Sequence, residues 1–381
     1  MRRPGLDGGS WPSDQVEDLL RAALLDPAPA REAWDRVAPT LAVTWHGLGE
    51  VQRTLPLVLG TIGADAMGPH GAAAKRLHRE AWRDNRLHLH HAHRWVEALG
   101  GEVPVLVLKG MALATTAYAD LGRRPMHDID LLVPEDRIGR ALDLLLAAGW
   151  VAADGTSIPR SWRTRHGAPL VHPDGGHIDV HRVPGVPFMR RRGDRSAPTF
   201  WDRTRPLDVG GHRLARPASE DLLLNVVVHG LTSVPGGSPR WVADAVLLLR
   251  HDPPDWDRLV TRARAFGVVP MARSALRYLA DAFGAPVPAD ALWDLWAIPL
   301  PAGDRRRFDV VTSAATDGST AADVSIIRAR WARMRTAIGP AGAAMALPRF
   351  TADVVDVDRL PEVPREVARR VASRVGRRPR A

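Results

Sequence analysis

The chain has 381 residues, of which 45% are hydrophobic, and its formal net charge is +9. This length and composition fit two or three globular units, each able to bury a core. The absence of cysteine excludes disulfides and thiolate metal sites. The first residues contain no apolar signal segment and no run is long enough to span a membrane, so we expect a cytoplasmic protein without a membrane partner.

The positive charge comes almost entirely from arginine, because the only lysines are Lys75 and Lys109. Heavy use of Arg, Ala, Gly and Pro is typical of GC-rich coding, so the charge alone is weak support for nucleic-acid binding. A basic balance still favours anionic ligands, whether phosphates or RNA. Nucleic acid, including tRNA, is therefore an alternative partner and not the favoured one.

Residues 1–99 are predicted to form a helical N-terminal cap. Apolar positions recur at helical spacing in several segments that Pro and Gly separate, and Ser13 is suited to cap the first helix. The predicted helices cover residues 13–25, 51–62 and 72–99.

The last of these helices contains four histidines in the run HLHHAH. They form two pairs with a spacing of three, so each pair could share a helix face and bind a metal. No cysteine or carboxylate stands at a matching spacing, which favours a solvated or partner-facing surface instead. The histidines are His88, His90, His91 and His93.

Residues 100–213 are predicted to form the core. A short apolar strand after residue 103 is followed by a turn at Lys109-Gly110, a helix from residue 111 to 120, an Arg-rich loop and a second strand. That second strand opens with Asp128 and Asp130, whose side chains point to the same face.

The two carboxylates lie about 7 Å apart along the strand and repel each other, which a buried face tolerates poorly. A divalent cation removes the repulsion, and Mg²⁺ prefers hard oxygen ligands of this kind. The paired acids therefore predict a magnesium site. The alternative is that Asp128 and Asp130 cap a turn or bind neighbouring arginines.

A third acid follows on a predicted hairpin, after a helix over 135–148. The hairpin joins residues 168–172 to residues 177–181 through the turn Pro-Asp-Gly-Gly. In its second strand His177, Asp179 and His181 share one face. Together these elements predict an α/β fold with a mixed sheet that presents three carboxylates, although an ion pair between Asp179 and Arg182 is an alternative.

Three motifs occur in this order: Lys-Gly at 109–110, RxxxDIDLLV from Arg124, and IDVH ending at His181. Together they resemble the uncharacterised nucleotidyltransferase family of the DNA polymerase β-like superfamily. The superfamily more commonly has Gly-Ser at the turn, where this chain has Gly110-Met111. The helical segments SEDLLLNVVVHG and RWVADAVLLL also resemble the C-terminal half of this family.

The resemblance implies transfer of a nucleoside monophosphate from an NTP to a hydroxyl-bearing acceptor, with two Mg²⁺ ions. Asp128 and Asp130 would bind the ions, and Asp179 would complete the acceptor-side ion and could help to deprotonate the hydroxyl. The acceptor is open: a small molecule, a peptide or protein, or RNA.

The resemblance also implies contacts to the nucleotide. Gly110 would let the backbone approach the triphosphate, and the following helix would offer its N-terminal amides. Lys109 and Arg124 would supply cations to the phosphates, although Arg124 could instead belong to a solvated loop. His181 could orient Asp179 or be an ordinary polar partner.

Two other functions remain open. One is a toxin-type nucleotidyltransferase acting on tRNA, and the other is a non-catalytic nucleotide-binding partner protein of a biosynthetic cluster. The three acids argue against a non-catalytic protein.

Residues 184–215 are rich in Arg and Pro and are predicted to be an irregular loop or linker. Residues 214–381 are predicted to form a helical C-terminal domain with a basic tail. Its predicted helices cover residues 219–229, 240–250, 256–266 and 270–283.

Overall fold

This computed structural model of the protein describes most of the first 300 residues and a few later positions. The described residues are 11–41, 49–153, 167–185, 188, 199–232, 240–300, 331, 344, 347–348, 351, 360–365 and 368.

A mixed seven-stranded sheet forms the centre of the fold, with the strand order β3-β4-β5-β2-β1-β7-β6. Two neighbouring pairs, β2–β5 and β1–β7, are parallel, and the other four are antiparallel. The strands are β1 Leu106–Val107, β2 Ile129–Leu132, β3 Val151–Ala152, β4 Gly167–Val171, β5 His177–His181, β6 Thr204–Val209 and β7 His212–Pro217.

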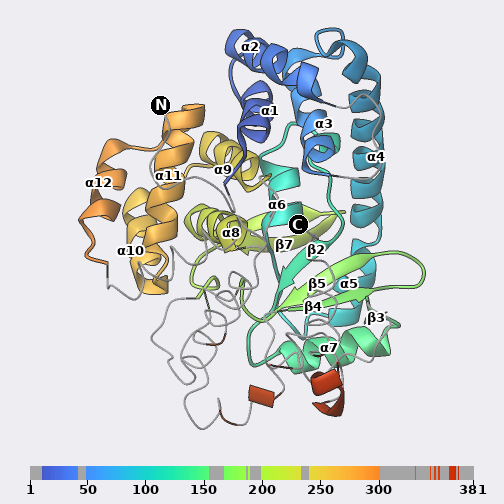
Figure 1. Cartoon of the computed structure of the whole chain (residues 1–381). Coiled ribbons are helices and arrows are strands. Elements are labelled where there is room, and N and C mark those ends of the chain that lie inside the picture. The colour runs from blue at the N-terminus through green and yellow to red at the C-terminus, as the bar shows by residue number, and fades with distance from the viewer. Residues whose placement is uncertain are drawn as a thin grey trace.

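Helices surround the sheet (Figure 1). The N-terminal helices α1, α2 and α3 lie at one end of the molecule, and α10, α11 and α12 lie together at another. Their bounds are α1 Asp14–Leu24, α2 Pro27–Val37, α3 Glu50–Ile62, α4 Gly71–His90, α5 Ala92–Leu99, α6 Lys109–Thr116, α7 Ile138–Ala147, α8 Ser219–Thr232, α9 Arg240–His251, α10 Trp256–Phe266, α11 Val269–Phe283 and α12 Ala289–Ala297. Short 3-10 turns are η1 Ala38–Thr40, η2 Gly68–His70, η3 Leu121–Arg123 and η6 Leu360–Glu362.

The fold class predicted from the sequence is confirmed: a mixed α/β sheet is flanked by helical segments from both ends of the chain. The division into residues 1–99, 100–213 and 214–381 stays a prediction, and its second boundary falls inside β7. The basic tail lies largely outside the described residues. No helix in the described part of the chain is long and apolar enough to cross a membrane.

Local signals account for most of the helices. Ser13 caps α1 by accepting a hydrogen bond from the Val16 amide, and Asp255 caps α10 in the same way. Gly100 and Gly284 end α5 and α11 in left-handed conformation. Of these four residues, Ser13 is the cap predicted from the sequence.

The single helix predicted over 72–99 is instead two helices, α4 and α5, that meet at His91. At this break the ring of His91 packs against the glycine turn between β4 and β5: a Cβ on Gly175 would lie 2.6 Å from its Nε2. Tertiary contact with the hairpin therefore coincides with the interruption of a pattern that is locally continuous.

The prediction of irregular structure over 184–215 is wrong for its last part. Residues from Thr204 to Pro217 form the β6–β7 hairpin, which turns through Gly210 and Gly211, both with positive φ. The arginines and prolines in these strands are typical of loops, so the sequence did not predict the hairpin. Two smaller corrections concern helix starts: Lys109 and Gly110 form the first turn of α6, and α7 begins at Ile138.

Candidate functional site

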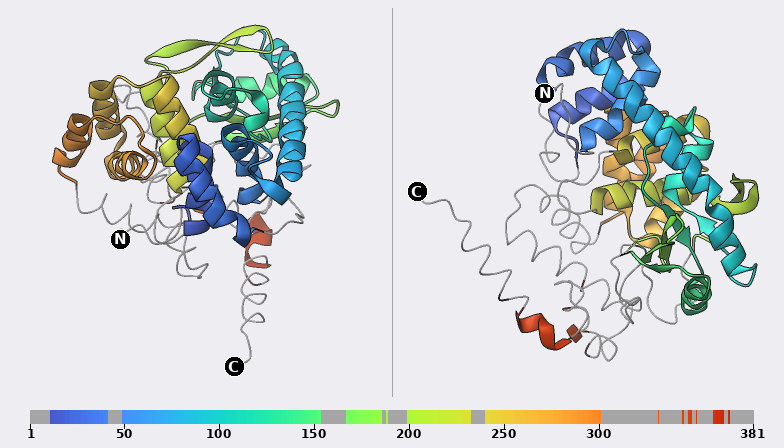
Figure 2. Two further views of the ribbon diagram at one scale, coloured as in Figure 1. Left: turned by 90° about the horizontal axis from the view of Figure 1, so that it is seen from above. Right: turned by 90° about the vertical axis from the view of Figure 1, so that its right-hand side faces the viewer.

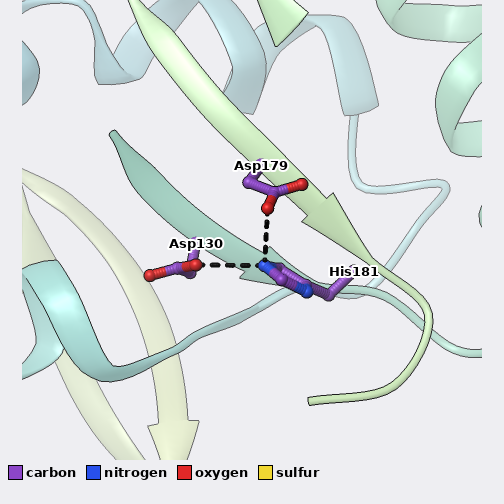
Figure 3. A group of neighbouring side chains, drawn as sticks. All are labelled: Asp130, Asp179 and His181. Atoms are coloured by element: carbon purple, nitrogen blue, oxygen red, sulfur yellow. Dashed lines mark hydrogen bonds and ion pairs between the residues drawn. The ribbon is translucent and has the colours of Figure 1, made fainter. Parts of the chain in front are cut away.

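Two neighbouring strands bring the predicted acids together. β2 and β5 are parallel, and their register places Asp130 directly beside Asp179. His181, two residues further along β5, points into the same space (Figure 3). Its Nε2 lies 3.0 Å from Oδ1 of Asp130 and 3.2 Å from Oδ2 of Asp179. One imidazole thus links the two carboxylates.

The chain passes from β1 into α6 next to these side chains. The Leu108 amide donates a hydrogen bond to the carbonyl oxygen of Asp130 at 2.9 Å, which ties the start of the helix to β2. Lys109 is the first residue of α6, and its Nζ donates to Oδ1 of Asp130 at 2.7 Å. Lysine and histidine therefore share one oxygen of the same buried carboxylate.

This arrangement controls the charge of the site. Burial would raise the pKa of Asp130, but Lys109 and His181 outweigh it and hold the pKa well below its usual range. Burial would lower the pKa of His181, yet Asp179 and Asp130 raise it to about 9. Both shifts favour the charged forms, a carboxylate at Asp130 and an imidazolium at His181.

Asp128 is exposed and stands immediately before β2. Desolvation by the surrounding protein raises its pKa, and repulsion from Asp130 and then Asp179 raises it further, against an opposing effect of Lys109. Asp128 thus belongs to the same electrostatic group. Its direct role as a metal ligand stays a prediction.

Gly110 lies between two charged groups of the site. A Cβ added to it would lie 3.6 Å from Oδ2 of Asp130 and 3.6 Å from Nη1 of Arg124. Because the first amides of a helix have no acceptor within the helix, the start of α6 offers backbone donors beside Gly110, and no side-chain cap comes from Leu108. An anionic oxygen could approach here.

Arg124 is buried and not solvated. Its Nε and Nη2 donate to the two oxygens of Asp244 at 2.8 and 2.7 Å, and the Tyr118 hydroxyl donates to the same carboxylate at 2.7 Å. This leaves Nη1 as the atom that faces Gly110. The prediction of a phosphate contact from Arg124 therefore concerns this one nitrogen.

Several residues that support the site were not predicted. A Cβ on Gly167 in β4 would lie 2.8 Å from Oδ1 of Asp179 and 3.0 Å from Nδ1 of His181. A glycine inside a strand is a general signal for such a close approach. From α4, Asn85 donates from Nδ2 to the carbonyl oxygens of Leu121 and Arg124, both at 2.7 Å, and so holds the loop that leads to β2.

The histidine run of α4 does not form a metal site of three or more ligands in the described part of the chain. His90 lies in ring contact with both His91 and His93, at centroid distances of 5.1 and 5.9 Å. His88 is partly buried toward Met126 and the site loop. The metal site and the solvated or partner-facing surface both stay predictions for this run.

Two carboxylates, together with an imidazole that could join them on losing its proton, form the donor set that could hold a metal. One ligand atom from each of Asp130, Asp179 and His181 lies within 4.8 Å of the others. The carboxylate oxygens suit a hard divalent cation, and Oδ2 of Asp130 is left over from the hydrogen bonds to Oδ1. The residues therefore fit a divalent ion.

The sequence and structure of the chain were compared with those of known proteins. A model of a family described as "Uncharacterised nucleotidyltransferase" matches residues 48–284, more than half of the chain. Among curated proteins, none matches. A solved structure that matches is an antigenic nucleotidyltransferase-like protein from Paracoccidioides brasiliensis, with 17% identity over 54% of this chain and 96% of that one, and a TM-score of 0.35. The extent of the family match decides the classification: this chain belongs to the uncharacterised nucleotidyltransferase family.

Proposed function

We propose that the protein is a Mg²⁺-dependent nucleotidyltransferase that transfers a nucleoside monophosphate from an NTP to a hydroxyl-bearing acceptor. The observation that carries this proposal is the parallel register of β2 and β5, which sets Asp130 beside Asp179 at the start of α6. The carboxylates that would bind cations therefore lie next to the backbone amides that would bind phosphates.

The acids are assigned to the ions and the acceptor. Asp128, Asp130 and Asp179 would hold two Mg²⁺ ions, and His181 keeps the two strand carboxylates in place. When bound, the ions would stabilise negative charge on the entering and leaving oxygens. The acceptor oxygen bonds to the α-phosphorus, the bond from that phosphorus to the bridging oxygen breaks, and pyrophosphate leaves. Asp179 accepts the proton of the acceptor hydroxyl.

The cations are assigned to the triphosphate. Lys109 is the first residue of α6, and its Nζ lies beside Asp130. A phosphate oxygen placed at the start of α6 would therefore be within reach of this ammonium group. The Nη1 of Arg124 faces the same place from the other side of Gly110. Such preorganised donors stabilise the charge that develops on the leaving pyrophosphate.

The test is incubation of the protein with each α-labelled NTP, Mg²⁺ and fractionated cell extract. We expect label to pass to a component of the extract, and Asp130→Asn and Asp179→Asn to abolish the transfer. Asp174→Asn is the matched control, because Asp174 lies at the turn of the same β4–β5 hairpin and is 74% exposed. Its transfer should equal that of the unmodified protein.

A non-catalytic partner protein would behave differently. It would transfer no label, and Mg²⁺ would add nothing to any rise in unfolding temperature that nucleotide causes. Transfer that survives in both Asp130→Asn and Asp179→Asn would also overturn the proposal, because the acids would then be dispensable.

A further inference from the structure

One face of α4 carries a row of basic residues with an exposed tryptophan among them. Lys75, Arg79, Trp82 and Arg86 follow one another at spacings of four, three and four, so their side chains share one line along the helix. With a rise of about 1.5 Å per residue, this basic row is about 16 Å long. Figure 2 shows α4 running along the outside of the molecule.

The members of the basic row are exposed. Two other arginines of α4 are matched by acids: Arg76 lies 3.7 Å from Glu80, and Arg83 lies 2.8 Å from Asp84. Among the described residues, no acid forms an ion pair of this kind with the three cations of the basic row. Their charge is therefore directed to solvent or to an anionic partner.

Trp82 distinguishes the basic row from an ordinary solvated face. It is 49% exposed, and the guanidinium carbon of Arg86 lies 5.8 Å from its ring centroid. An exposed indole next to arginine presents both a flat apolar surface and a positive charge. Unstacked nucleic-acid bases bind to surfaces of this kind, while lysine and arginine bind the phosphates.

An adjoining side of α4 is attached to the loop that leads into β2. Asn85 holds the carbonyl oxygens of Leu121 and Arg124, and Nε2 of His78 lies 2.7 Å from Oδ1 of Asp120. The same helix therefore presents the basic row outward and fixes the loop that enters β2. A chain bound along the row would lie next to this loop.

We propose that the basic row binds single-stranded RNA, with phosphates on Lys75, Arg79 and Arg86 and a base stacked on Trp82. The binding surface stands on its own observations. The further step, that this RNA supplies the acceptor hydroxyl, rests on the proposed function.

The test is fluorescence anisotropy with a short labelled single-stranded RNA, without NTP and with EDTA, so that chemistry does not contribute. The charge variant is Lys75→Gln with Arg79→Gln and Arg86→Gln. Its control removes three positive charges elsewhere, through Arg31→Gln, Arg36→Gln and Arg277→Gln, whose side chains are 50%, 53% and 62% exposed.

We expect the charge variant to bind RNA at least about tenfold more weakly than the control. Each phosphate contact to a single strand contributes about 0.7 to the slope of log K against log salt, so the slope should fall by about 2. Trp82→Ala should weaken binding about tenfold. Trp293→Ala, at a tryptophan that is 75% exposed on α12, should not.

The inference is overturned if the intact protein does not bind the RNA, if the charge variant binds as its control does, or if Trp82→Ala matches Trp293→Ala. Vesicles with anionic lipid provide a further arm: loss of vesicle binding alone in the charge variant would assign the basic row to a membrane surface and overturn it.

The result is independent of catalysis. The Asp130→Asn protein should bind RNA as the intact protein does. If the intact protein binds RNA through the basic row but transfers no nucleotide, then the binding inference stands and the proposed function fails.

Discussion

Replacing Gly110 by alanine should make the protein more stable and less active. Gly110 lies in the first turn of α6 and is not one of the glycines with positive φ, so alanine fits its backbone. The added Cβ would lie 3.5 Å from Sδ of Met126 and 3.6 Å from both Nη1 of Arg124 and Oδ2 of Asp130. These are ordinary contacts, so no atom has to move.

The magnitudes follow from this geometry. Glycine inside a helix costs about 0.5–1 kcal/mol relative to alanine, so Gly110→Ala should be up to that much more stable. The methyl group, however, takes the space through which we expect a phosphate oxygen to approach the start of α6. A displacement of about 1 Å can cost about a hundredfold in rate, or roughly 2.7 kcal/mol.

The assays are urea denaturation for stability and label transfer from NTP for activity. The control is Gly101→Ala, because Gly101 is exposed and has φ of 73° with no atom near the new Cβ. That variant should lose stability through backbone strain and keep its transfer rate. The reasoning is refuted if Gly110→Ala transfers label at the normal rate, or if it is less stable than the unmodified protein.

Three further changes test other parts of the structure. Burial, with the nearby charge of His177, lowers the pKa of His88 from 6.5 to about 4, so the fold favours the neutral ring. The contribution of the neutral His88 ring to the free energy of unfolding should be fully present above pH 6.5 and fall as the pH drops toward 4, by up to about 2 kcal/mol at pH 5. In urea titrations His88→Gln should remove this loss. An equal loss in both proteins would contradict the prediction. Gly167→Ala should displace Asp179 and weaken Mn²⁺ binding by about tenfold or more in calorimetry, and an unchanged affinity would show that the contact is not needed. Asp244→Asn should destabilise the protein by about 3–5 kcal/mol, because it leaves a buried guanidinium without its carboxylate; a loss below about 1 kcal/mol would rule this out.

The local patterns of the sequence predicted the elements that carry the site. Alternation along HIDVH placed Asp179 and His181 on one face, and the structure has them together beside Asp130. Capping residues and helical spacing predicted most helices, and α10 has the predicted bounds of Trp256 to Phe266. These features depend on residues close in the chain.

Contacts between distant residues were not predictable from such patterns. Arg124 and Asp244 are 120 positions apart, and nothing in the local sequence of either residue indicates the other. The parallel register of β2 and β5 likewise depends on how the whole sheet assembles. The β6–β7 hairpin was missed for a different reason: its strands are polar enough to resemble a loop, although its Gly210-Gly211 turn is a hairpin signal.

Because Lys109 and His181 both contact Asp130, folding does not have to wait for metal binding. In a site made only of acids, repulsion between the carboxylates would oppose folding until a metal ion was bound. Here the polypeptide supplies its own neutralising partners, so the mature fold can form in a metal-poor environment. In the proposed function, loading with an ion would then exchange one set of counter-charges for another.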